Sequence, residues 1–94
     1  MTLRANIFRL GAHQSVAYTA TAGTIATAFA TGTWAVRVIV TTHAFVRIGT
    51  DPTAVTTDTY VPADVPHVFL ASPGEKLSAV RVTGNGTAHV TELS

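Results

Sequence analysis

Four histidines are the side chains of this sequence that titrate near neutral pH: His13, His43, His67 and His89. Metal sites on regular elements use ligands at i and i+2 on a strand or i and i+4 on a helix, and no two of these histidines have either spacing. Cysteine, the other common ligand for such metals, is absent. We therefore predict no metal site and interpret the histidines as residues of loops and surfaces.

The acidic residues show no catalytic pattern either. Hydrolysis requires a pair of carboxylates, or a nucleophile beside an oriented base. Four of the five acids fall in expected turns or loops, where solvated carboxylates are common, and no G-x-S-x-G motif is present. The sequence therefore predicts a protein without enzymatic activity and without a cofactor. The five acids are Asp51, Asp58, Asp64, Glu75 and Glu92.

Three aromatic residues allow a different chemistry. Trp34, Tyr18 and Tyr60 could form a platform on which sugar rings stack, as in carbohydrate-binding modules. Residues of this type more often lie in a core or an interface, so both interpretations stay open. The tripeptide Asn85-Gly86-Thr87 matches the glycosylation pattern, but we interpret it as part of a turn.

The elements that must position these residues are arranged around residues 34–49, WAVRVIVTTHAFVRIG. Trp34, Val36, Val38 and Val40 occupy every second position, so a strand would place all four on one face. A second extended run follows at 44–48. The two runs predict a central pair of strands. Thr42-His43 is a poor two-residue turn, so we expect a wider bend there, or a strand that crosses to a second sheet.

The N-terminal third gives weaker signals. Residues 2–10 predict a first strand or an extended arm, which a break at 11–14 ends. A second strand is expected at 15–21. For residues 20–30 we expect a loop through Gly23 and a short strand at 25–29, with a helical turn as the alternative.

The C-terminal half shows alternating strands and turns. Short strands are expected at 60–61, at 67–70, at 77–82 and at 87–93. Pro62 and Pro66 indicate an edge position, since proline lacks the backbone donor. Pro73-Gly74 suits a type II turn, and Gly84-Asn85-Gly86 is the strongest hairpin signal. The sequence predicts a single domain, residues 1–94, that is an all-β sandwich or small jelly roll of seven to eight short antiparallel strands.

Charge is unusually sparse in this chain. Asp, Glu, Lys and Arg make up 12% of the 94 residues, with a net charge of +1, against about 25% in ordinary soluble domains. Thr and Ala together make up about a third. A surface of such short, neutral side chains is easily desolvated against protein. We therefore expect a homo-oligomer or another multi-copy assembly, while a compositional bias of the genome is the alternative explanation.

The same numbers bear on other partners. The arginines are scattered, so no basic patch for nucleic acid is expected. No segment reaches the roughly 18 apolar residues that cross a membrane. The N-terminus carries charges within its apolar stretch, so we do not expect secretion by a signal peptide.

About two thirds of the chain, at the C-terminal side, resembles a group of short proteins encoded among tailed-phage and prophage virion genes. The similar segments are VRVIVTTHAFVRIG, TDTYVPADVPHVF, PGEKLSAVRVTGNG and TAHVTEL. The resemblance implies a virion location and a capsid decoration (cement) protein, or another small head or tail component. It implies as partners the major capsid protein or another virion protein and further copies of the chain, with a trimer by analogy to shell proteins at threefold positions. It transfers no catalytic or cofactor residues.

Two hypotheses follow. In the first, the chain is a virion structural protein whose N-terminal segment, with Leu3, Ile7 and Phe8, docks on a neighbouring copy or on the capsid. In the second, it is a carbohydrate- or receptor-binding module displayed on a virion, which uses Trp34, Tyr18 or Tyr60.

Overall fold

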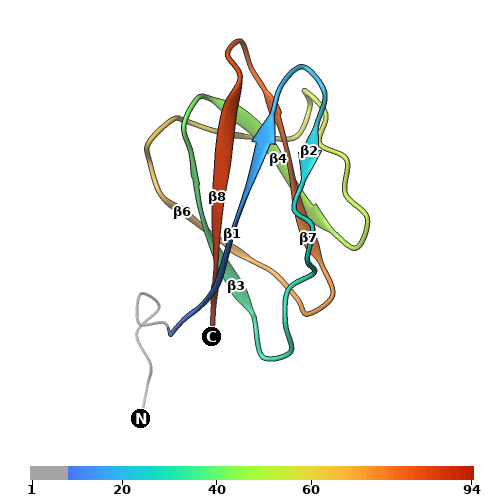
Figure 1. Ribbon diagram of the computed structural model, residues 1–94, viewed down its shortest axis with the longest axis vertical. Helices are drawn as coiled ribbons and strands as arrows, with labels where there is room; N and C mark the ends of the chain where they lie inside the picture. The colour runs from blue at the N-terminus through green and yellow to red at the C-terminus, as the bar shows by residue number, and fades with distance from the viewer. Residues whose placement is uncertain (1–8) are drawn as a thin grey trace.

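Eight β-strands build two packed sheets, and this confirms the predicted all-β sandwich (Figure 1). The computed structural model describes residues 9–94. Within them there is no helix, and so none that is long and apolar enough to span a membrane. The strands are β1 (Leu10–Tyr18), β2 (Gly23–Thr24), β3 (Ala35–Val40), β4 (Ala44–Gly49), β5 (Thr59–Val61), β6 (His67–Leu70), β7 (Lys76–Arg81) and β8 (Gly86–Leu93).

The strands follow the order of a jelly roll. Sheet A has the order β1-β8-β3-β6 and sheet B the order β2-β7-β4-β5. The first strand pairs with the eighth, the second with the seventh, the third with the sixth and the fourth with the fifth, all antiparallel. The chain is therefore one long hairpin with its tip between β4 and β5, and this hairpin is rolled into two layers. The two ends of the described chain meet, because Arg9 and Ser94 exchange two backbone hydrogen bonds of 2.7 and 3.0 Å.

The central run of sequence crosses from one sheet to the other. Val36, Val38 and Val40 of β3 are fully buried, whereas Arg37 between them is exposed. The strands β3 and β4 lie in different sheets and do not pair with each other, so the expected crossing is confirmed and the pairing is not. Trp34, predicted on the same face as these valines, precedes β3 and is 47% exposed.

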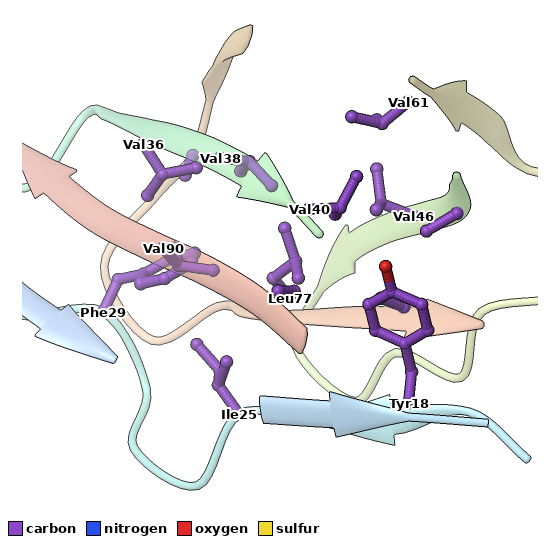
Figure 2. Packing of buried hydrophobic residues seen from close by; sticks show 14 residues of the cluster. Tyr18, Ile25, Phe29, Val36, Val38, Val40, Val46, Val61, Leu77 and Val90 are labelled. Carbon is purple, nitrogen blue, oxygen red and sulfur yellow. The ribbon is translucent and has the colours of Figure 1, made fainter. Parts of the chain in front are cut away.

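The core lies between the inward faces of the sheets (Figure 2). Valines of β3 and β8 in sheet A face Val46 and Leu77 of sheet B, with Val61 at the β5 edge. Burial of each such side chain stabilises the fold by about 1.5–3 kcal/mol. Tyr18 and two residues of the β2–β3 connection, Ile25 and Phe29, complete the core.

The N-terminal third differs from the prediction in three places. Gly23, which is expected in a loop, lies in the short strand β2. The break expected at residues 11–14 is instead part of β1. A bulge between Leu10 and His13 shifts the register there, and β1 continues to pair with β8 on both sides of it. The expected strand at 25–29 is absent from the described chain. Ile25 and Phe29 are instead buried individually in an irregular segment. Their backbone amides donate hydrogen bonds to the carbonyls of Leu77 (3.0 Å) and Glu75 (2.8 Å), respectively.

One predicted turn is confirmed and another is wrong. Gly74 has a φ of 88°, and the Glu75 amide donates to the Ser72 carbonyl at 3.1 Å, as in a type II turn. The Gly84–Gly86 segment does not close a hairpin, because it joins β7 of sheet B to β8 of sheet A. Neither of its glycines has a positive φ, which the favoured hairpin turns require.

Gly86 is needed for space. A methyl group at Gly86 would lie 2.6 Å from the Tyr18 hydroxyl oxygen and 2.8 Å from Oγ1 of Thr41, and closer still to Oγ1 of Thr42. The Tyr18 hydroxyl also donates to the Thr42 carbonyl at 2.5 Å and accepts from its amide at 3.2 Å. This cluster joins the end of β1 and the start of β8 to the bend between β3 and β4.

We expect Gly86→Ala to lower the free energy of unfolding by about 1–3 kcal/mol, because the added methyl group overpacks the Tyr18–Thr42 cluster. Gly84→Ala is the matched control, since its nearest neighbour would be 3.7 Å away, and we expect a change within about 0.5 kcal/mol. Urea unfolding of both variants measures the difference. Equal stabilities would contradict this role of Gly86.

Candidate assembly surface

Two of the four histidines come together. His13 of β1 and His89 of β8 stack on the outer face of sheet A, with ring centroids 5.6 Å apart and an angle of 13° between the rings. No group of three or more potential metal ligands occurs in residues 9–94. Neither spacing in sequence nor side-chain type predicted this pair, because strand pairing between the two ends of the chain creates it.

The other two histidines contribute to packing. His43 follows the bend after β3, and its Nδ1 accepts a hydrogen bond of 3.0 Å from the Ala63 amide. His67 of β6 pairs with inward-facing Val38 and stacks on Phe69 at 6.1 Å. The Nε2 atom of His67 is buried without a hydrogen-bond partner.

Glu92 is a buried acid with a structural role. It lies on the inward face of β8 and is 4% exposed. Its Oε1 accepts hydrogen bonds from the Ala30 amide (2.9 Å) and from the Thr33 hydroxyl (2.6 Å). The carboxylate thus holds the β2–β3 connection against the end of the sandwich. We find no second carboxylate with which it forms a hydrogen bond in the described chain.

The three aromatic residues of the sugar-binding hypothesis do not form a platform. Tyr18 is 1% exposed and its hydroxyl is bonded within the core. Tyr60 lies on the outer face of sheet B, where its ring meets the edge of Phe45 at 5.9 Å. Trp34 directly precedes β3 in sheet A. These rings therefore belong to three separate environments.

A row of apolar residues crosses the outer face of sheet A. Strand register places Leu10 beside Leu93, Leu93 beside Ala35, and Ala35 beside Leu70. The two inner members are buried, whereas Leu10 is 72% and Leu70 79% exposed. We call these four residues the apolar row. Leu70 therefore presents an apolar side chain at one edge of the sheet and Leu10 at the other.

The next row of the same face carries the only charged side chain of β3. Arg37 pairs with Val68, which is 51% exposed, and with Thr91. Val68 and Leu70 were not predicted as surface residues. The feature that could have identified them is the alternation within residues 67–70, which places His67 and Phe69 on one face of the strand and the two aliphatic residues on the other.

The two lateral edges of the sandwich, the β1–β2 side and the β5–β6 side, differ in how tightly they are packed. On the β1–β2 side, the Gln14 side chain donates to the Thr27 carbonyl at 2.8 Å and accepts from the Thr27 amide at 3.1 Å. Gly23 packs so closely there that a β-carbon would overlap the Ala17 carbonyl. This side is closed.

On the β5–β6 side a groove of about 270 Å³ remains. We call this side the open seam. Apolar side chains from both sheets, Val46 and Ile48 of β4 and Phe69 of β6, line the groove. Its other lining residues are Arg47, Asp58 and Thr59.

Asp58 fixes the wall of this groove. Its Oδ2 accepts the Val55 amide at 2.8 Å, and its Oδ1 accepts Nε and Nη2 of Arg47 at 3.1 and 3.0 Å. The hydrogen bond from the Val55 amide, together with the bonds and the positive charge of Arg47, holds the pKa of Asp58 below its usual value, although desolvation opposes this. Folding therefore stabilises the charged, carboxylate form of Asp58.

The contact residues predicted from the sequence, Leu3, Ile7 and Phe8, lie outside the described residues. Within residues 9–94, the apolar row and the open seam are two surfaces where apolar side chains from different strands come together. No known protein family, curated protein or solved structure matches this chain.

Asp58→Asn should be less stable than the wild type at pH 7, because the charged partner of Arg47 is lost. The lowered pKa means that Asp58 contributes stability above its ordinary pKa and loses it as the pH falls through the folded-state value. We therefore expect the difference in urea midpoint to shrink as the pH falls below the ordinary carboxyl pKa of 3.8. Asp51→Asn, at an exposed position, is the control. A difference that stays constant as the pH falls would contradict the prediction.

Proposed function

We propose that this chain is a non-enzymatic structural protein of a virus particle, a decoration protein that binds the outside of a capsid shell and stabilises it as a homo-oligomer. The observation that carries the proposal is the outer face of sheet A, where Leu10, Val68 and Leu70 are exposed and where Arg37 is the one arginine within the described strands of that sheet. The resemblance of the strand and turn segments to phage virion proteins supports the same assignment.

The energetics of such a contact favour this surface. A standard interface buries about 800 Å² on each partner, which is roughly one seventh of the 5405 Å² surface of this chain. Because few charged groups must lose their hydration in such a contact, the gain from burying apolar surface is reduced only slightly by the cost of desolvating charges. A domain of this kind can therefore bind a shell through many shallow contacts and without chemistry.

The proposed partners are further copies of the chain, arranged as a trimer, and the major capsid protein or another virion protein. The N-terminal segment, with Leu3, Ile7 and Phe8, is the proposed docking arm. The alternative, a carbohydrate- or receptor-binding module on a virion, has less support, because Tyr18 is buried and Trp34 and Tyr60 are associated with different sheets.

Binding to shells that lack this protein, taken from the phage or prophage that encodes it, tests the proposal. We expect Leu70→Glu to weaken binding at least about 10-fold, because a charge would replace an apolar contact. Val82→Glu is the control, since Val82 is 37% exposed and follows β7 of the other sheet. Cosedimentation measures both, and equal binding by Leu70→Glu and wild type would contradict the proposed surface.

Deletion of residues 2–8 tests the arm in the same assay. The deletion must stop there, because Arg9 pairs with Ser94 and Leu10 begins β1. We expect the truncated chain to keep a cooperative unfolding transition and to lose particle binding. Normal binding by a folded truncated chain would show that the segment is not a docking arm.

A further inference from the structure

The open seam has the shape of a site for an extended segment. The short strand β5 pairs only with Ala44–Val46 of β4. The following residues, 47–49, have no strand beside them on that edge within residues 9–94. An added strand at this edge would continue sheet B, since unpaired backbone groups of an edge accept such a partner. The groove between Val46, Ile48 and Phe69 lies next to this edge.

We propose that the open seam binds the first eight residues of a second copy of this chain. The inference rests on the proposed homo-oligomer and names the contact that holds the copies together. The occupant is argued from the part of the chain that precedes Arg9, from its side-chain pattern and from the distance that it can span.

The pattern of this segment suits the groove. In MTLRANIF, the side chains of Leu3, Ala5 and Ile7 share one face of an extended chain, and Arg4, Asn6 and Phe8 share the other. The face with Leu3, Ala5 and Ile7 can enter the groove while Arg4 and Asn6 on the other face stay in water. The two charged residues that line the groove, Arg47 and Asp58, already form a salt bridge of 3.0 Å, so no unpaired charge there opposes the apolar side chains.

Distance assigns Ile7 of the bound segment to another copy. Arg9 lies on the line of β1, where it pairs with Ser94, and Phe69 lies on β6 at the opposite edge of sheet A. Three strand spacings separate these edges, about 14 Å. Ile7 is two residues from Arg9, a reach of at most about 7 Å. Ile7 can therefore enter the seam of a neighbouring copy but not the seam of its own chain.

The absence of cysteine makes a crosslinking test direct. One single-cysteine variant, Ile7→Cys, is mixed with a ¹⁵N-labelled second variant, Thr59→Cys, whose residue lines the groove. Thr83→Cys replaces Thr59→Cys in the control, because Thr83 is exposed beyond the end of β7 and away from the groove. After mild oxidation without capsid shells, mass spectrometry measures the mixed disulfide dimer.

We expect the Ile7–Thr59 dimer to exceed the Ile7–Thr83 dimer at least 5-fold. Equal yields would overturn the assignment of the seam. A chain that carries both Ile7→Cys and Thr59→Cys and closes on itself would overturn the assignment to a second copy. Because shells are absent, either failure is distinct from a failure of Leu70→Glu to change particle binding.

Discussion

The neighbouring strands β3 and β4 each bury one face in the core. Because these faces point toward each other from opposite sheets, the chain must cross from sheet A to sheet B at residues 41–43. Val36, Val38 and Val40 face the core from sheet A, and Ala44 and Val46 face it from sheet B. The bend between them is held by the Tyr18 hydroxyl, which binds both the carbonyl and the amide of Thr42. Because β1 ends and β8 begins at this cluster, the bend between β3 and β4 is tied to both strands of the outermost pair of the rolled hairpin.

Much of the architecture could be predicted from local patterns. Alternation identified β3, β4, β6, β7 and β8 to within about two residues, and Pro73-Gly74 identified a type II turn because only glycine adopts its positive φ freely. Two segments gave wrong predictions. The Gly11–Gln14 run suggests a break, yet a bulge accommodates it inside β1. The Asn85-Gly86 signal suggests a hairpin, yet glycine serves there to admit the Tyr18 hydroxyl.

The candidate surfaces could not be predicted, because residues far apart in sequence form them. The apolar row joins Leu10, Ala35, Leu70 and Leu93, and only the strand order of sheet A makes them neighbours. The groove likewise requires that β5 begin only at Thr59, opposite Val46 of β4, while β6 supplies Phe69 from the other sheet. Composition indicated a surface suited to protein contacts but not where on the molecule such a surface lies.

The two sides of the sandwich suggest how one small domain can serve an assembly. Gln14 and Gly23 close the β1–β2 side, so the backbone there is already satisfied. The β5–β6 side leaves part of an edge and a groove, and the face beside it carries Leu70. Contacts between copies and contacts with a shell can therefore use different parts of the same molecule, which lets the proposed oligomer form before it binds.

The central claim is that so sparsely charged a β-domain associates with other copies of itself. Multi-angle light scattering of the intact chain from micromolar to near-millimolar concentration tests this claim most directly. The account predicts a mass that is an integral multiple of the 9.8 kDa chain, with a trimer as the proposed state. A mass of one chain across the whole concentration range would contradict it.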